Sequence, residues 1–257
     1  MTIPRIYHPF PPDKDTTVTL GGADFRYIRQ VLRLRPGATV ILFDGRGREF
    51  TARIEAVSAG TATLLITGEE RTPPPACSIT LAQSLPKGAK MDLIVQKTTE
   101  LGVNRIIPFI SSRSVPRLTE EKKHARADRW RKIAREAARQ CGRATVPEVT
   151  EVVSFDELLE APGEDTLRLI FWEHERRQSI RGILTDERYR HRSRLDLIVG
   201  PEGGFSENEV ETARQGGCIP VTLGDAILRT ETSPLTIISI VQYERGGFDP
   251  PESGCQP

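Results

Sequence analysis

The stretch GDAILRTETSPL, residues 224–235, places an arginine, a glutamate and two threonines between two apolar runs. A guanidinium can stabilise an anion that forms during a reaction, and a neighbouring carboxylate can accept a proton. Arg229, Thr230 and Glu231 are therefore the candidate catalytic residues. The alternative is a surface ion pair of Arg229 with Glu231, which contributes about 0–1 kcal/mol to stability.

A second segment, GPEGGFS at 200–206, has the composition of a ligand-binding loop. Gly200, Gly203 and Gly204 can adopt positive φ and let a flat ligand approach the main chain. The segment matches neither the phosphate-binding loop nor the dinucleotide fingerprint, so the sequence does not favour nucleotide hydrolysis or NAD binding. A glycine-rich turn without a ligand is the alternative interpretation.

Both segments follow runs that are typical of strands in an α/β domain with a mostly parallel sheet. The predicted strands are residues 78–85, 105–110, 167–172, 195–200 and 218–223. Longer periodic stretches at 88–102 and 119–140 predict helices. In open parallel sheets, ligands bind beyond the carboxyl ends of the strands, so we expect the two unusual segments to share a site.

Three helix starts carry recognisable signals. Ser154 with Glu157 and Ser206 with Glu209 have the spacing of capping boxes, in which hydroxyl and carboxylate satisfy free backbone donors. Ser233 is the expected N-cap of the last helix, because a proline follows it at the first helical position. The cluster at 229–232 is therefore expected in a loop.

The first part of the chain has the pattern of a small β-barrel or sandwich. Short strands are predicted at 38–43, 49–57 and 61–67. A helical insert at 23–34 has its apolar residues at helical spacing; these are Phe25, Ile28, Val31 and Leu32.

Three successive prolines at 73–75 mark the boundary after this part, because they remove backbone donors and favour a stiff, extended chain. We expect a small β-barrel or sandwich domain at 1–72, a second domain at 77–247 and a flexible tail at 248–257.

The charge is balanced overall, with 36 Lys and Arg against 35 Asp and Glu, so an anionic partner must be bound locally. The window 113–143 concentrates eleven basic against four acidic residues. An RNA phosphate contact is the preferred interpretation, and a solvated helix face is the alternative. The candidate RNA-binding residues are Arg129, Arg131 and Lys132 in this window and Arg5, Arg29, Arg33 and Arg35 near the N-terminus.

The four cysteines are far apart and lie near no histidine cluster, which predicts reduced thiols rather than disulfides or zinc. The chain starts without an apolar stretch of signal-peptide length, and no segment approaches the roughly 20 apolar residues of a membrane helix. We expect a cytoplasmic protein that binds neither a metal nor a membrane.

Several separated motifs together resemble a known family. They are LIVGPEGGFSENEV (197–210), LGDAILRTETSPL (223–235), IPRIYHP (3–9), VLRLRPG (31–37), LFDGRGREF (42–50), KGAKMDLIVQKTTELGV (87–103) and RQCGRATVPEV (139–149). The chain resembles the uracil-N3 methyltransferases of 16S ribosomal RNA, in the SPOUT superfamily. Asp225 and Ala226 depart from the family pattern, which more often has proline and a basic residue there.

The resemblance implies an N-terminal PUA-like β-barrel that binds RNA and a C-terminal SPOUT α/β domain with a trefoil knot. It implies S-adenosylmethionine as cofactor, 16S rRNA of the small ribosomal subunit as substrate, and a homodimer. Three loops at strand ends would hold the cofactor, through Phe171, Trp172, Glu173, Gly200, Pro201, Glu202, Gly203, Leu223, Gly224, Ile227, Leu228 and Arg229.

Methylation at N3 sets a specific chemical task, because neutral uracil is a poor nucleophile until its N3 proton is removed. We expect Arg229 to orient or stabilise the uracil, with Glu231 or Glu202 as the proton acceptor. Lys97 and Glu100 are either a surface pair or part of the site. The alternative functions are methylation of another base or of a ribose 2′-O, and a non-catalytic RNA-binding assembly factor.

Overall fold

The computed structural model describes residues 3–9, 16–114, 118–160 and 165–249. The chain divides into two compact units. One comprises Met1–Pro74 and Arg135–Val146, and the other comprises Pro75–Ala134 and Pro147–Pro257. The expected tail lies outside the described residues from residue 250 onward.

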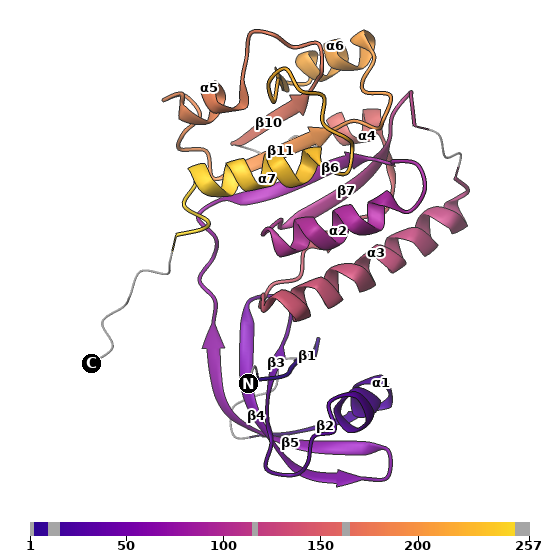
Figure 1. Ribbon diagram of the computed structural model, residues 1–257, viewed down its shortest axis with the longest axis vertical. Coiled ribbons are helices and arrows are strands. Elements are labelled where there is room, and N and C mark those ends of the chain that lie inside the picture. Colours follow the sequence, from indigo (N-terminus) through magenta and orange to yellow (C-terminus); the bar gives the residue numbers. More distant parts are fainter. Residues whose placement is uncertain (1–2, 10–15, 115–117, 161–164, 250–257) are drawn as a thin grey trace. The chain divides into compact units, whose positions relative to one another are not determined.

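The N-terminal unit is built on a five-stranded sheet in the order β1-β3-β4-β5-β2 (Figure 1). The strands are β1 (Arg5–Tyr7), β2 (Thr17–Gly21), β3 (Thr39–Phe43), β4 (Arg48–Ser58) and β5 (Thr61–Arg71). Neighbours are antiparallel except β1 with β3. Alternate side chains of β3, β4 and β5, among them Val40, Ile54 and Leu64, form the core.

The helix of this unit is shorter than predicted and partly π-helical. α1 (Gly22–Arg26) continues into a π-helical turn at Tyr27–Val31. Ile28 is fully buried, but Val31 is 67% exposed. The wider π-helical turn departs from the 3.6-residue spacing on which the prediction rested, so Val31 leaves the buried face.

Residues 135–146 pack with the N-terminal unit, although the sequence analysis placed them in the second domain. The Cζ atom of Arg139 lies 4.4 Å from the ring centroid of Tyr27, and its guanidinium donates to the Tyr27 hydroxyl. The Gly47 N–H donates to the carbonyl of Ala144 at 3.2 Å. Such long-range contacts leave no signal in the local residue pattern.

The C-terminal unit is a parallel sheet of seven strands with helices packed against it (Figure 1). The strand order is β12-β10-β11-β6-β7-β8, and β9 pairs with β7. The strands are β6 (Ser78–Ser84), β7 (Arg105–Ile110), β8 (Glu148–Val149), β9 (Val153–Ser154), β10 (Thr166–Phe171), β11 (Arg194–Val199) and β12 (Ile219–Val221).

The central strands are apolar along most of their length because they are buried on both faces. Their register aligns the carboxyl ends: Val199 pairs with both Gln83 and Phe171, and Phe171 pairs with Val221. The segments that follow β6, β10, β11 and β12 therefore start at one edge of the sheet. This edge is where the sequence analysis expected a ligand.

Two helices lie close to their predicted ranges: α2 (Lys90–Glu100) and α3 (Glu120–Cys141), the last part of which, from Arg135, belongs to the N-terminal unit. The C-terminal unit also contains α4 (Phe155–Glu160), α5 (Ile180–Thr185), α6 (Glu207–Gln215) and α7 (Ser233–Glu244). Both capping boxes are present, at the starts of α4 and α6. The expected N-cap of α7 was wrong by one residue: Thr232 is the N-cap, because the Ser233 N–H already donates to the carbonyl of Arg229 at 2.9 Å.

Candidate cofactor and catalytic site

A cavity of about 600 Å³ lies at the carboxyl edge of the parallel sheet. Its wall is formed by the ends of β10, β11 and β12, by the loops that follow them, and by Lys90 from α2. All the residues that the sequence analysis assigned to the cofactor line this cavity. Arg229, Thr230 and Glu231 line it as well, so one cavity holds the candidate binding and catalytic residues.

The loop after β11 requires glycine at one position. Gly204 has φ +64°, and a Cβ on it would overlap the carboxylate of Glu173. Its N–H donates to the carbonyl of Pro201 at 3.0 Å, which closes the turn. The carboxylate of Glu173 therefore lies directly against the main chain of the glycine-rich loop.

The segment at 111–114 fixes the same loop in place. Glu209 is 8% exposed and accepts hydrogen bonds from the N–H of Ser112 at 2.7 Å and from its hydroxyl at 2.8 Å. Burial raises the pKa of Glu209, but the hydrogen bonds from Ser112 and Ser206 outweigh it and lower the pKa overall. In addition, Arg113 donates to the carbonyl of Gly203 at 2.7 Å.

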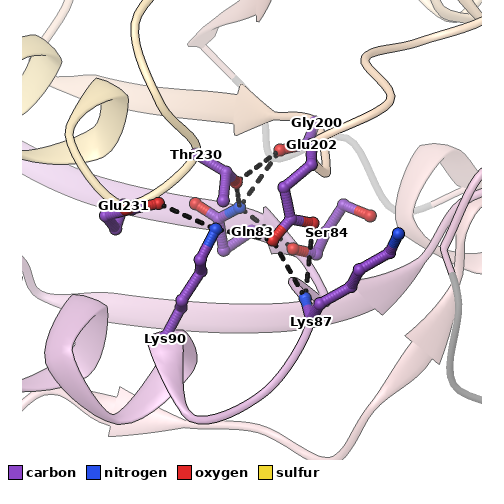
Figure 2. Close-up of polar contacts among 8 residues, drawn as sticks. All are labelled: Gln83, Ser84, Lys87, Lys90, Gly200, Glu202, Thr230 and Glu231. Atoms are coloured by element: carbon purple, nitrogen blue, oxygen red, sulfur yellow. Dashed lines mark hydrogen bonds and ion pairs between the residues drawn. The ribbon is translucent and has the colours of Figure 1, made fainter.

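Thr230 links two of the loops that line the cavity (Figure 2). Its buried hydroxyl donates to the carbonyl of Gly200 at 3.0 Å. Nε2 of Gln83, at the end of β6, lies 3.3 Å from the same carbonyl and 3.4 Å from the Thr230 hydroxyl. The hydroxyl proton of Thr230 is used in this bond, which ties the loop before α7 to the loop after β11.

Lys90 joins the start of α2 to two loops of the cavity (Figure 2). Its Nζ lies 2.9 Å from Oε1 of Glu202 and 3.2 Å from Oε2 of Glu231. The N–H of Lys87 donates to both carboxylate oxygens of Glu202, at 3.2 Å and 3.3 Å. This cluster places both candidate proton acceptors beside one cation.

Arg229 is exposed at the cavity wall, and its guanidinium forms no ion pair within the described residues. Glu231 forms its ion pair with Lys90 and not, as the alternative interpretation required, with Arg229. An unpaired guanidinium beside a cavity remains available for an anionic or polarised ligand.

Sequence reasoning did not single out Lys90 or Gln83. Both are more than 100 residues from the loops that they contact, so no local spacing reveals them; only the motif at 87–103 included Lys90. Lys97 and Glu100, which spacing left undecided, form an ion pair at 2.9 Å and do not line the cavity.

The basic residues of the N-terminal unit differ in accessibility. Arg5 is largely enclosed: it pairs with Glu49, donates to the carbonyl of Arg143 at 3.2 Å and lies 5.1 Å from the ring centroid of Phe43. These contacts make it a packing residue. Arg29, Arg33 and Arg35 are exposed.

The basic residues of α3 are paired more often than the sequence suggested. Arg129 pairs with Asp92 on α2, and Arg131 pairs with Asp128 and Glu151 at 2.9 Å and 2.8 Å. Counting acids along the helix alone missed the partners from other elements. Lys132 is exposed and has no ion pair among the described residues.

Within the described parts of the chain, no helix is long and apolar enough to cross a membrane. The same residues contain no group of three or more His, Cys, Asp or Glu side chains arranged to hold a metal ion. Cys77 and Cys218 are buried free thiols, and burial raises the pKa of Cys77 to about 11.

Comparison with known proteins assigns the two parts of the chain. A model described as an RNA methyltransferase domain matches residues 73–242, which include the whole cavity wall. A model described as an RNA methyltransferase PUA domain matches residues 20–67. The chain belongs to this RNA methyltransferase family. The N-terminal unit is thus PUA-like, and the parallel-sheet unit is a methyltransferase domain.

Several members of the family are similar to this chain over most of its length. The ribosomal RNA small subunit methyltransferase E of Bacillus subtilis is 35% identical over 235 residues, which cover 89% of this chain and 90% of the relative. The protein of the same name from Synechocystis is 33% identical, covering 88% of this chain and 72% of the relative. The resemblance stated from the motifs is therefore confirmed.

Solved members of the family have the same fold. The ribosomal RNA small subunit methyltransferase E of Neisseria gonorrhoeae, bound to S-adenosyl methionine, has a TM-score of 0.85 and 36% identity, covering 94% of this chain and 98% of that one. A methyltransferase of Legionella pneumophila, also with this cofactor bound, has a TM-score of 0.79 and 30% identity, covering 95% and 98%.

Proposed function

We propose that this protein transfers a methyl group from S-adenosylmethionine to N3 of a uridine in 16S rRNA of the small ribosomal subunit. The observation that carries the proposal is the cavity at the sheet edge, where Arg229 and two ionised carboxylates lie beside a glycine-rich loop. Membership of the RNA methyltransferase family and the names of its similar members support the reaction and the substrate.

The cavity suits a ligand that combines an aromatic base, a ribose and an amino acid. Its volume of about 600 Å³ lies in the usual range for small-molecule sites. Phe171, Leu223 and Leu228 supply apolar wall for the base. The main chain at Gly203 and the carboxylate of Glu173 supply polar groups for hydroxyl and amine donors. Bound there, the cofactor supplies an activated methyl group on sulfur.

The residues beside this wall are suited to the acceptor base. N3 of neutral uracil carries a proton, and its lone pair becomes available only when that proton leaves. The exposed guanidinium of Arg229 can stabilise the negative charge that then develops on the ring oxygens. Glu231 or Glu202 can accept the proton, because both carboxylates are ionised at neutral pH.

The N-terminal domain, residues 1–72, is proposed to bind the RNA around the target uridine. Exposed Arg29, Arg33 and Arg35 supply phosphate contacts there, and exposed Lys132 supplies one on α3. The domain at 77–247 is proposed to be a SPOUT domain with a trefoil knot, to act as a homodimer and to work in the cytoplasm, as the family resemblance implies.

The test is nucleoside analysis of 16S rRNA from cells that lack the gene, before and after complementation. Loss of N3-methyluridine, and its return with the wild-type gene, is the expected result. Loss of a different methylated base, or of a 2′-O-methyl ribose, would instead show that the enzyme methylates a different atom of the RNA. Unchanged RNA, together with no heat of binding for S-adenosylmethionine in calorimetry, leaves the non-catalytic assembly factor as the function.

A further inference from the structure

The two carboxylates that share the ammonium of Lys90 are held in different ways (Figure 2). Glu202 is bonded through both oxygens, because Lys87 N–H donates to Oε1 and Oε2 while Lys90 contacts Oε1 at 2.9 Å. These three hydrogen bonds occupy most of the acceptor positions of the Glu202 carboxylate. Glu202 has the contacts of an anchor between its loop and the start of α2.

Glu231 keeps acceptor capacity that no other described residue uses. Its Oε2 is buried and lies at ion-pair distance from Lys90, 3.2 Å, but no donor meets it with hydrogen-bond geometry among the described residues. The side chain is 19% exposed and lines the cavity. Because Oε2 is held against Lys90, the exposed part of the carboxylate is the part that a ligand N–H in the cavity can reach.

We propose that Glu231 accepts the proton of the target base, and that Lys90 is the positioning residue that holds Glu231 at the cavity. Glu202 fixes Lys90 and is not a second acceptor. The assignment rests on the proposed function. The N3–H bond breaks and its proton goes to the Glu231 carboxylate. The N3 electron pair forms the bond to the methyl carbon, and the electron pair of the broken C–S bond stays on sulfur. The proton then passes to water.

The charges around Glu231 keep it in the state that an acceptor requires. The groups that face it are Lys90 from α2, Arg229 from its own loop and Glu202 from the neighbouring loop. A hydrogen bond from its own backbone N–H lowers the pKa of Glu231, and Lys90 and Arg229 lower it further against the effect of burial. The ammonium stays charged because its hydrogen bond to Glu202 raises the pKa of Lys90.

The experiment is single-turnover methylation of small ribosomal subunits from a strain that lacks the gene, at saturating cofactor and over a range of pH. Glu231→Gln is expected to slow methyl transfer by about 10²- to 10⁴-fold, the usual effect of losing a general base. Cofactor affinity, measured by calorimetry, is expected to stay within about threefold. Glu202→Gln is expected to lose much less rate.

Variants of Lys90 separate positioning from general destabilisation. Lys90→Met removes the cation, so the acid limb of the rate profile is expected to move to higher pH, and Lys90→Arg is expected to restore it. Lys97→Met is the matched control, because it removes a lysine of the same helix that pairs with Glu100 and does not line the cavity. If Glu231→Gln does not fold, Glu231→Asp, which shortens the reach, is expected to lose rate in the same assay.

Two outcomes overturn this assignment while leaving the proposed function intact. One is folded Glu231→Gln or Glu231→Asp protein that methylates within about threefold of the wild-type rate. The other is a larger loss for Glu202→Gln than for Glu231→Gln. If wild-type protein binds the cofactor but leaves the subunits unmethylated, the proposed function itself has failed.

Discussion

The carboxylate of Glu173 lies in the space that a Cβ on Gly204 would occupy. Glu173 belongs to the loop after β10 and Gly204 to the loop after β11, so this close approach joins two walls of the cavity. Gly204 also has positive φ, so a substitution there would strain the backbone and displace the Glu173 carboxylate. A Cβ on Gly200 would meet the ring of Phe205 at 3.2 Å, and one on Gly203 would meet the side chain of Arg113 at 3.4 Å.

Gly204→Ala is expected to weaken cofactor binding and to lower the melting temperature. The new methyl group must displace the Glu173 carboxylate, and alanine strains the backbone at φ +64°. Calorimetric titration with S-adenosylmethionine and thermal unfolding measure both effects. Gly217→Ala is the matched control, because Gly217 also has positive φ, has no atom within 4 Å of an added Cβ and does not line the cavity; it is expected to bind the cofactor almost normally. Equal affinity of the two variants contradicts the role given to Gly204.

Loss of charge at Lys132 is expected to weaken RNA binding evenly across RNA sequences and to reduce the salt dependence of binding. If Lys132 contacts one phosphate, Lys132→Ala should lower the slope of log affinity against log salt by about 0.7–0.9. Binding of small subunits at several salt concentrations measures the slope. A slope equal to that of wild type would mean that Lys132 contacts no phosphate and that this face of α3 is only a solvated surface.

Glu209 is expected to make the stability of the cofactor loop depend on pH. Its folded-state pKa is lowered from the ordinary value of 4.5, so its stabilising contribution is present above that pH and is lost as pH falls through the folded pKa. The stability difference between wild type and Glu209→Gln should therefore be largest at neutral pH and shrink in acid. Chemical unfolding of both proteins from pH 7 to pH 3 tests this, and a constant difference contradicts it.

Local pattern predicted most of the second domain. The apolar runs at 78–85, 105–110, 167–172, 195–200 and 218–223 became β6, β7, β10, β11 and β12, because strands buried on both faces must be apolar. Both capping boxes were predicted because their signal, a serine followed three residues later by a glutamate, lies within one short segment. β8 and β9 have two residues each, too few to give a period.

The cavity itself was found because glycine-rich and polar loops after parallel strands meet at one edge of the sheet. What the sequence did not show is which charges pair. Lys90 with Glu231, Arg129 with Asp92 and Arg131 with Glu151 each join separate elements. Pairing of this kind depends on the fold, so counting charges along one helix overestimated the basic surface of α3.

The guanidinium of Arg229 is central to the account, because it lines the cavity without an ion pair in the described residues and is assigned to stabilise the charge on the target base. Arg229→Ala should leave cofactor affinity nearly unchanged, because the guanidinium is assigned to the target base and not to the cofactor. The loss should fall on the methyl-transfer step, as for removal of a donor that stabilises an oxyanion.

Single-turnover methylation of unmodified small subunits by Arg229→Ala, at saturating cofactor and with the product nucleoside identified by mass spectrometry, is the most direct measurement. The account predicts N3-methyluridine formed about 10²- to 10³-fold more slowly than by wild type, with normal cofactor binding. A rate within about threefold of wild type corresponds to less than about 1 kcal/mol of transition-state stabilisation and would contradict the role of Arg229.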